Sequence, residues 1–455
     1  MTPLPDVLPI KPFTRPARGE VTLPGSKSIT NRALLLAALC DGPVTLTGAL
    51  FSEDTEIMAE SLRRLGFTVK EDQPGKTISV EGRGGQIPNE KAELFVGNAG
   101  TAARFLTALC AAAPRGVYKL DGVPQMRKRP MKGLIDALRR LGAEIRCLEE
   151  EGFFPLEIYP HGLKELSQAK IDSSESSQLL SALLMVAPLS HSGVFIELSS
   201  EVRRPFVRMT TKIMEDFGIL IMREYKPKEL ISIRSGNYRL GKKHYSIEPD
   251  ASAASYFLTL PLITSGNLNL PGLHGKEVGL QGDIRFIDVL CMIGEKIDEG
   301  KGYVAVEFSP NEKRRGLNEN FREFSDTFLT LAAISPLLEG TTTITGIAHT
   351  RKQETDRVAG AARELKKLGQ DVVEEEDSLT LTPNLNELRK RAAEGMIEIE
   401  TYNDHRFAMS FAILGCHDLL GNGRPWLAIK NPACCAKTFP NFFDVLEQVW
   451  KNSHQ

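Results

Sequence analysis

Several charged and polar residues of this chain stand where helices are predicted to begin. The first turn of a helix presents free N–H groups and a partial positive charge, which together favour an anion by about 0.3–1 kcal/mol. Lysine and arginine at the same places would add full charges. The pattern predicts a site for small anionic substrates, built from Lys27, Asn98 to Arg104, Arg129, Ser176 to Gln178, Asp326, Glu354 to Arg357, His405, Arg406 and Lys437.

Lys27 lies in the stretch LPGSKSITNR, where an apolar strand-like run meets a helix-like one. The residues Gly-Ser-Lys-Ser in this stretch are similar to the end of a phosphate-binding P-loop, Gly-x-x-x-x-Gly-Lys-Ser/Thr. That interpretation fails because Ser26 precedes the lysine and Glu20 stands where the first glycine should be. A surface lysine near a helix start and a substrate-binding lysine remain as alternatives.

An internal repeat organises these helix starts. Leu-Gly or a similar ending recurs in RRLGF, RRLGA, EDFGI, CMIGE and KKLGQ. Each glycine suits the left-handed backbone position that ends a helix. The glycines are spaced 76, 76, 76 and 75 residues apart, at Gly66, Gly142, Gly218, Gly294 and Gly369.

Each repeat shows the same order of features. A polar start leads into an apolar helix, and a β-rich run, a second amphipathic helix and further strands complete the unit. Apolar stretches such as RALLLAAL and RFLTALC are expected in the core. Six copies of a β-α-β-α-β-β unit predict an α/β protein, and groups of three would give two domains of similar size.

Composition narrows the classes of function. The 455 residues favour two or three domains. A formal net charge of −2 indicates no general attraction to nucleic acid or membranes. No apolar run approaches the roughly 18 residues of a membrane span, and the opening residues resemble no export or transit peptide. The cysteines form no Cys-x-x-Cys pair and are expected to be reduced core residues of a cytoplasmic protein.

Eight motifs, taken together, resemble the 5-enolpyruvylshikimate-3-phosphate synthase family. In chain order they are LPGSKSITNRALLLAAL, GNAGTAARFL, RKRP, SSQLLSALLM, GDIR, QETDR, YNDHRFAM and KTFP, from residue 23 to residue 440. The resemblance implies a cytoplasmic transferase of the shikimate pathway, which leads to chorismate and the aromatic amino acids. It also implies a monomer that needs no metal or organic cofactor.

The family fold implied is a pair of inside-out α/β barrels, in which the sheets of three units pack around buried helices. By resemblance, the first domain covers residues 22–242, and the second takes residues 1–21 plus 243–455. The active site is expected in the cleft between the two domains.

The implied reaction joins phosphoenolpyruvate to the 5-hydroxyl of shikimate 3-phosphate and releases phosphate, by addition and then elimination. Addition needs a base for the hydroxyl proton and an acid for the methylene carbon. Asp326 is the expected base and Glu354 matches the family's proton donor, although helix capping is the competing interpretation of each. Lys27 matches a lysine that touches both substrates. His405 is expected to tune neighbouring acids, with a structural role as the alternative.

The resemblance also implies two sets of ligands. Arginine suits this work because its planar fork engages two oxygens at once, although a solvated salt bridge is the alternative for any single arginine. The expected phosphoenolpyruvate ligands are Lys27, Asn98, Gly100, Arg129, Gln178, Arg357, Arg406 and Lys437. The expected shikimate 3-phosphate ligands are Lys27, Ser28, Arg32, Ser176, Ser177, Gln178, Arg203, Asp326, His349 and Gln353.

Four residues depart from the family pattern on the shikimate side. Gln353 stands where a substrate-binding lysine is common, and it can donate a hydrogen bond but no charge. His349 replaces a frequent asparagine, whereas Arg203 and Phe206 stand where serine and tyrosine are common. We therefore expect a more cationic phosphate pocket and a larger share of proton transfer for Lys27.

Three other functions predict sequence features that differ from those of this chain. An enolpyruvyl transferase acting on UDP-N-acetylglucosamine should begin Gly-Ala-Lys-Asn and carry a loop cysteine, where this chain has Gly-Ser-Lys-Ser and RKRP. An RNA 3′-phosphate cyclase should show a basic surface and a nucleophilic histidine motif. A non-catalytic binding protein should have lost some of the charged residues, which are nearly all present.

Overall fold

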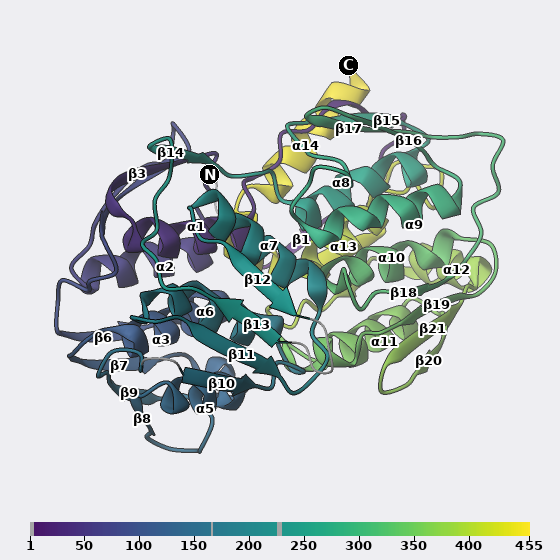
Figure 1. Ribbon diagram of the computed structural model, residues 1–455. Coiled ribbons are helices and arrows are strands. Elements are labelled where there is room, and N and C mark those ends of the chain that lie inside the picture. Colours follow the sequence, from purple (N-terminus) through teal and green to yellow (C-terminus); the bar gives the residue numbers. More distant parts are fainter. Residues whose placement is uncertain (1–3, 165–166, 225–229) are drawn as a thin grey trace. The chain divides into compact units, whose positions relative to one another are not determined.

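Six small sheets with one strand pattern account for the β structure in residues 4–164, 167–224 and 230–455, which the computed structural model describes. The chain divides into two units (Figure 1). Unit 1 comprises the residues up to Pro24 together with Glu248–Gln455, and unit 2 comprises Gly25–Ile247. In every sheet a parallel pair of strands is followed by an antiparallel strand, and five sheets add a fourth strand, again antiparallel.

Unit 2 holds three sheets, in the orders β14-β3-β5-β4, β6-β7-β9-β8 and β10-β11-β13-β12. The strands are β3 (Asp41–Thr47), β4 (Thr68–Asp72), β5 (Thr77–Arg83), β6 (Lys91–Phe95), β7 (Val117–Asp121), β8 (Glu144–Cys147), β9 (Leu156–Tyr159), β10 (Ser167–Ile171), β11 (Val194–Leu198), β12 (Ile221–Glu224), β13 (Leu230–Ile233) and β14 (His244–Ser246). The late strand β14 completes the first sheet, with His244 opposite Thr45.

Unit 1 holds the other three sheets, in the orders β16-β17-β15-β2, β18-β19-β21-β20 and β1-β23-β22. The strands are β1 (Val7–Pro9), β2 (Arg18–Glu20), β15 (Asn267–Pro271), β16 (Lys296–Gly300), β17 (Tyr303–Glu307), β18 (Asn318–Asn320), β19 (Thr342–Thr345), β20 (Asp371–Glu374), β21 (Ser378–Thr382), β22 (Ile397–Ile399) and β23 (Leu427–Lys430). Here the N-terminal strands β1 and β2 complete sheets whose other strands come from the C-terminal half.

The helices alternate with these strands in the predicted order, as in β6-α3-β7-α5-β8-β9 with the short α4 before α5, and the predicted α/β class is confirmed. The prediction of six full units is wrong for the last one, β22-α13-β23-α14, which lacks the two final strands and takes β1 into its sheet instead. Unit 2 contains α1 (Lys27–Leu39), α2 (Glu53–Arg64), α3 (Gly100–Ala112), α4 (Pro124–Arg127), α5 (Lys132–Arg140), α6 (Ser177–Val186), η1 (Ala187–Leu189) and α7 (Arg204–Asp216). Unit 1 contains α8 (Ala251–Thr264), η2 (Gly282–Arg285), α9 (Phe286–Ile293), η3 (Ser325–Thr327), α10 (Phe328–Ile334), η4 (Ser335–Leu337), η5 (Ala348–Lys352), α11 (Arg357–Lys367), α12 (Leu385–Glu394), α13 (His405–Gly415), η6 (Pro432–Lys437) and α14 (Phe442–His454).

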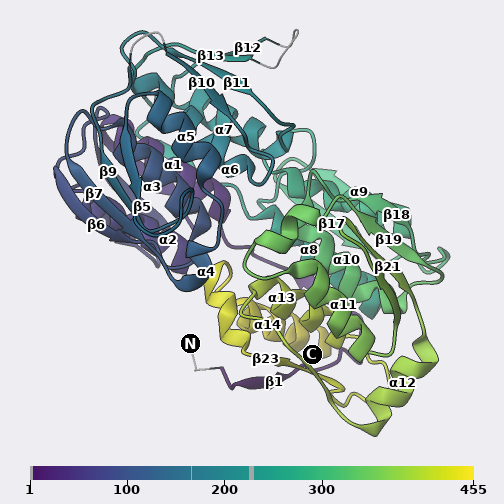
Figure 2. The ribbon, with the colours of Figure 1, turned by 90° about the horizontal axis from the view of Figure 1, so that it is seen from below.

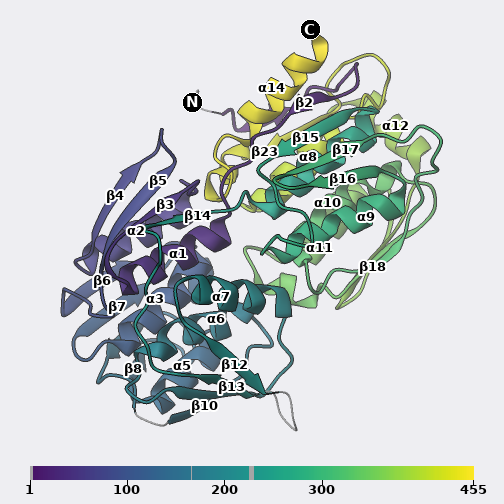
Figure 3. The same ribbon diagram turned by 45° about the horizontal axis from the view of Figure 1, so that its top comes forward.

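The first helix of each repeat forms the core of its unit. In α1 every residue from Ile29 to Leu39 is buried, and all of α3 is buried as well. A helix that is covered on all sides has its sequence apolar all round, as RALLLAAL is. Figure 2 shows β5, β7 and β9 on the outer side of α1 and α3. In unit 1, β15 and β17 contact the buried helix α8 (Figure 3).

The five repeat glycines end helices as predicted. They follow α2, α5, α7, α9 and α11, and all have positive φ, from 80° at Gly369 to 112° at Gly142. At Gly66 the chain closes the helix with a bond from the Phe67 N–H to the Leu62 carbonyl, which is the Schellman pattern. The period seen in the sequence is therefore the period of the helix ends.

The helices and the cysteines bear on two further expectations from the sequence. No helix within the described ranges has the length and apolar character needed to cross a membrane. The cysteines are free thiols, and four of them are buried, as expected. The expectation of a core residue is wrong for Cys291, which is exposed on α9 next to the exposed Met292.

Candidate active site

Arg357 lies at the centre of a buried charge cluster in unit 1. It begins α11, is 2% exposed, and donates from Nε to Asp404 Oδ2 at 2.7 Å. Its Nη2 donates to Glu354 Oε2 at 2.8 Å, and Nη1 lies 3.4 Å from Asp326 Oδ1. Burial alone would disfavour the charge, but the carboxylates of Asp404 and Glu354 raise the pKa of Arg357. The cluster thus keeps the Arg357 guanidinium charged although it is buried.

Asp404 holds two arginines in place at once. It is fully buried, and its Oδ1 accepts from the backbone N–H of Arg406 at 2.9 Å, which caps α13. Its Oδ2 accepts the hydrogen bond from Arg357 Nε that is described above. Asp404 was not among the predicted site residues, although the Asn-Asp-His-Arg motif places an aspartate where an N-cap residue belongs.

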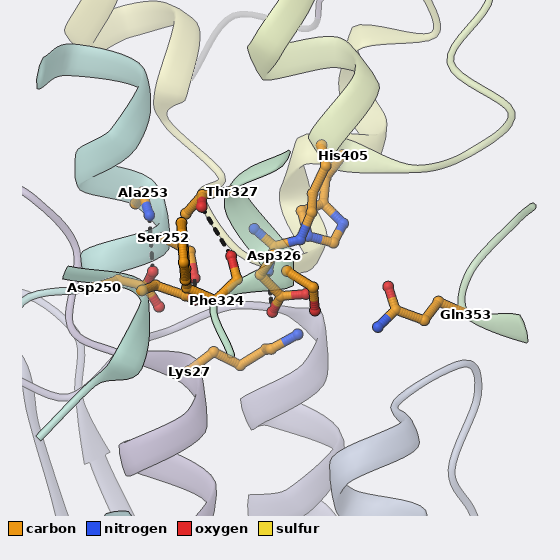
Figure 4. Close-up of polar contacts among 12 residues, drawn as sticks. Lys27, Asp250, Ser252, Ala253, Phe324, Asp326, Thr327, Gln353 and His405 are labelled. Carbon is orange, nitrogen blue, oxygen red and sulfur yellow. Dashed lines mark hydrogen bonds and ion pairs between the residues drawn. The ribbon is translucent and has the colours of Figure 1, made fainter. Parts of the chain in front are cut away.

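The other two cations of the cluster, Arg406 and Lys437, each contact one of the two predicted catalytic acids. Arg406 Nη2 donates to Asp326 Oδ2 at 2.7 Å, and Lys437 Nζ lies 3.5 Å from Glu354 Oε1. Both cations are nearly buried, with side chains 6% and 7% exposed. Figure 4 shows Asp326 from η3 and His405 from the start of α13, which belong to the same unit. The structure therefore brings five predicted site residues of unit 1 together: Asp326, Glu354, Arg357, Arg406 and Lys437.

The two departures in this unit also touch the cluster. Gln353 accepts a hydrogen bond from Arg357 Nη1 through Oε1. A lysine at this position could only donate, so it could not make this contact. His349 shares a hydrogen bond of 2.7 Å between its Nε2 and the hydroxyl of Ser325, next to Asp326.

A further buried acid lies beside Asp326 and Arg406. Asp283 of η2 is 5% exposed, and its Oδ2 accepts from the hydroxyl of Ser252 at the start of α8. Its Oδ1 is buried and has no hydrogen-bond partner within the described part of the chain. Burial, and next the charge of Asp326, raise the pKa of Asp283 to about 7. The GDIR motif contained this residue, but nothing in the motif signalled that the acid is buried.

Lys27 begins α1 in unit 2, where Ser26 caps the helix by accepting from the Ile29 N–H at 3.5 Å. The Lys27 ammonium lies 3.3 Å from a carboxylate oxygen of Asp54, whose side chain is 4% exposed. Asp54 was missed as a site residue because an acid in the first turn of α2 is also what ordinary helix stabilisation would place there.

Arg104 links two of the predicted phosphoenolpyruvate ligands in unit 2. Its Nη1 donates to the Gly100 carbonyl at 3.0 Å and to Gln178 Oε1 at 2.9 Å, which ties α3 to α6. A Cβ at Gly100 would lie under 3.0 Å from Nη1 of both Arg104 and Arg129. A side chain at this position would therefore displace the two guanidinium groups from this helix start.

Arg32 is the predicted shikimate 3-phosphate ligand that lies deepest. It is 1% exposed and donates to Thr210 Oγ1 at 2.8 Å, to the Ser28 carbonyl at 2.9 Å and to Ser181 Oγ at 3.3 Å. Burial lowers the pKa of Arg32 to about 9. These contacts join α1, α6 and α7, and the ligand role stays a prediction.

The remaining predicted residues also lie at helix starts. Ser176 caps α6 by accepting from the Gln178 N–H at 3.3 Å, and the buried Ser177 follows it. The His405 ring nitrogen Nδ1 lies 3.8 Å from Asp404 Oδ1. Asn98 precedes α3, and Arg203 precedes α7.

The fold and the site together define a class of protein. It is an α/β protein of repeated units whose buried helix starts carry paired cations and carboxylates, which suits a small anionic substrate and proton transfer. The chain matches the family model of EPSP synthase (3-phosphoshikimate 1-carboxyvinyltransferase) over residues 13–446 and belongs to that family. The resemblance predicted from the eight motifs is thereby confirmed.

Individual relatives extend over the whole chain. A 3-phosphoshikimate 1-carboxyvinyltransferase of Opitutus terrae is 59% identical over 452 residues, 99% of each chain. One of Cellvibrio japonicus is 41% identical over 95% of this chain and 97% of its own. Among solved structures, an EPSP synthase of Acinetobacter baumannii has a TM-score of 0.77 at 24% identity, covering 97% of this chain and 98% of its own. The enolpyruvyl transferase NikO of Streptomyces tendae has a TM-score of 0.72 at 17% identity, with 97% of both chains covered. The two structures share the fold with this chain.

Proposed function

We propose that this chain transfers the enolpyruvyl group of phosphoenolpyruvate to the 5-hydroxyl of shikimate 3-phosphate and releases phosphate, in the shikimate pathway. The full-length identity of 59% to a relative named for this activity supports the reaction. The structural observation that carries the proposal is a pair of carboxylates, Asp326 and Glu354, held against two buried arginines and a lysine.

The addition step uses the two carboxylates in opposite roles. The 5-hydroxyl oxygen bonds to C2 of phosphoenolpyruvate while Asp326 takes the hydroxyl proton. Glu354 gives a proton to C3, which becomes a methyl group. Both carboxylates contact Arg357, from η3 and from the turn after η5, so a base and an acid are available at one place, and the family resemblance supports which of them takes which role.

The elimination step restores the double bond. A proton leaves the methyl carbon, the C2–O bond to phosphate breaks, and phosphate departs with both electrons of that bond. Glu354 can take back the proton that it gave, and cations near the phosphate stabilise the charge that develops on the leaving group.

Residues of both units supply the proposed substrate contacts, and the arrangement of the two domains around the substrates stays a prediction. Arg357 and Arg406 would hold the phosphoenolpyruvate carboxylate by their planar forks. The phosphate would meet Lys437 from unit 1 together with Gly100, Arg129 and Gln178 from unit 2. Lys27, Asn98, His405 and the shikimate 3-phosphate set keep the roles predicted for them.

The first experiment is a phosphate-release assay on the purified chain with phosphoenolpyruvate and one of two acceptors. We expect release with shikimate 3-phosphate and none with UDP-N-acetylglucosamine. Release with the nucleotide sugar alone would assign the acceptor to the sister reaction. Release with neither acceptor would refute the proposed function. The monomeric state and the cytoplasmic location remain predictions, which gel filtration and fractionation of the source cells would test.

A further inference from the structure

The proposed proton donor Glu354 lies in a short bend between two helices. The helix η5 ends at Lys352, α11 begins at Arg357, and residues 353–355 between them form a bend that belongs to neither helix. A helix fixes its backbone by repeated hydrogen bonds, whereas the position of a side chain in a bend depends on what holds the two ends of the bend. The contacts at these ends therefore bear on where Glu354 lies.

An ion pair ties the two ends of the bend together. Arg351, near the end of η5, donates from Nη1 to both carboxylate oxygens of Asp356, at 3.1 Å and 3.0 Å. Asp356 is the N-cap residue of α11, and its Oδ1 also accepts from the backbone N–H of Ala359 at 2.9 Å. One carboxylate thus holds the end of η5 against the start of α11, with Glu354 on the bend between them.

Arg351 is itself fixed by the hairpin turn between β20 and β21. Its Nε donates to the Glu376 carbonyl at 3.0 Å, and its Nη2 donates to the Glu375 carbonyl at 2.6 Å. Its Nη1 also donates to Glu374 Oε1 at 2.9 Å, and the side chain is only 15% exposed. An isolated surface ion pair contributes little, but a planar guanidinium that makes several hydrogen bonds at once is held in one geometry.

The same turn also holds the first residue of η5. Asp377 accepts through Oδ1 from the backbone N–H of Ala348 at 2.6 Å. The helix η5 is thus attached to the turn at its start, through a backbone N–H, and near its end, through the Arg351 side chain. The segment that carries Glu354 is therefore held by the turn on one side and by the Asp356 cap on the other.

We propose that Arg351 and Asp356 are positioning residues for the reaction, which together set the place of Glu354 and, through it, the transfer of a proton to and from C3. This inference rests on the proposed function. Arg357 depends less on the pair, because its closest charge partner is Asp404 of α13, at 2.7 Å. Loss of the pair should therefore slow the proton transfer more than it weakens the binding of phosphoenolpyruvate.

The test is phosphate release by wild type, Arg351→Gln, Asp356→Ser and the double variant, over a range of concentrations of both substrates. Serine keeps an N-cap side chain for α11 but has no carboxylate to pair with Arg351. A misplacement of about 1 Å costs on the order of 10²-fold in rate, so we expect kcat to fall by about 10- to 100-fold in each single variant, with a change of less than about threefold in the KM for phosphoenolpyruvate. The double variant should lose no more than the weaker single variant, because both substitutions break the same pair.

Arg391→Gln is the matched control. Arg391 of α12 also pairs with a carboxylate, that of Glu387 at 2.8 Å, and donates to two backbone carbonyls at the end of α11. Its loss should lower the midpoint of urea denaturation and leave kcat at the wild-type value. A purely structural role for Arg351 would give Arg351→Gln the same result, with no loss of kcat in the folded protein.

Wild-type kcat in either folded single variant would overturn the inference, as would a loss confined to KM or additive losses in the double variant. Asp356→Ser decides the question if Arg351→Gln does not fold, since serine preserves the cap. Absence of phosphate release by wild type with shikimate 3-phosphate would instead refute the proposed function, so the two failures are distinguishable.

Discussion

The two units use their cations differently. In unit 1 Arg357, Arg406 and Lys437 each contact a carboxylate, from Asp326, Glu354 or Asp404. In unit 2 two hydrogen bonds of Arg104 go to neutral acceptors, a backbone carbonyl and the amide oxygen of Gln178, whereas Lys27 contacts an acid, Asp54. Cations matched by acids suit proton transfer, whereas cations on neutral partners keep their charge for an incoming anion.

Because of this difference, we expect substitutions in the two units to affect different steps of the reaction. We expect changes in the acids of unit 1 to act mainly on turnover and on pH dependence. Changes at the helix starts of unit 2 should act mainly on the affinity for substrate. The following variants are arranged from the largest expected effect to the smallest. Asp326→Asn and Gly100→Ala test that division directly, and the variants of Asp404 and Asp283 test the buried charges of unit 1 on which it rests.

Asp326→Asn should lower kcat by 10²–10⁴-fold, the range typical of a lost general base. Asparagine keeps an oxygen that can accept from Arg406, so the fold should be preserved. The measurement is phosphate release at saturating substrates, with circular dichroism as the check on folding. Asp136→Asn, which removes an exposed partner of Lys132 in unit 2, should keep wild-type turnover. Full turnover in Asp326→Asn would refute the base assignment.

Asp404→Ala should destabilise unit 1 by about 3–5 kcal/mol, because it leaves the buried Arg357 guanidinium without its closest charge partner. Asp404→Asn should lose less, since the amide oxygen can still cap α13 and accept from Arg357. Urea denaturation of the two variants and wild type measures the difference. A midpoint for the alanine variant equal to that of wild type would show that the pair contributes nothing.

Asp283→Asn should stabilise the protein in a pH-dependent way. The pKa of Asp283 is about 7 in the native state and about 3.9 when unfolded. The native state therefore binds the proton more tightly, and the wild-type free energy of unfolding falls as the pH rises from about 4 to about 7. Each pKa unit corresponds to about 1.4 kcal/mol, so the gain of the variant should reach at most about 4 kcal/mol and stay constant above pH 7. Thermal unfolding at pH 4.5, 6 and 8 would detect it, and a gain of the same size at all three values would contradict the buried titration.

Gly100→Ala should raise the KM for phosphoenolpyruvate by about tenfold, or about 1.4 kcal/mol, with a smaller effect on kcat. The added Cβ would push Arg129 and Arg104 away from the start of α3. Gly241→Ala is the control, because nothing lies within 4 Å of a Cβ built there. A change confined to kcat would contradict the expectation that the helix starts of unit 2 act mainly on substrate affinity.

Local signals in the sequence were enough to locate most of the candidate residues. Lys27, Ser177 and His405 each directly follow an N-cap residue, and cap chemistry is decided within three residues of the helix start. The eight motifs carried the family and, through it, Asp326 and Glu354 as a pair. The sequence could not show which acid pairs with which cation, because Asp404 and Arg357 are 47 residues apart and Asp326 and Arg406 are 80 residues apart.

The sequence by itself determined the repeated unit, its helix ends and the chemical types of the site residues, since glycine spacing, apolar runs and caps are local properties of the chain. Tertiary structure alone decided which acid meets which cation, that Arg32 lies in the core, and that Asp283 is a buried acid beside Asp326. The physical reason is that charge pairing and desolvation depend on distances between segments remote in the sequence, and only packing of the helices sets those distances.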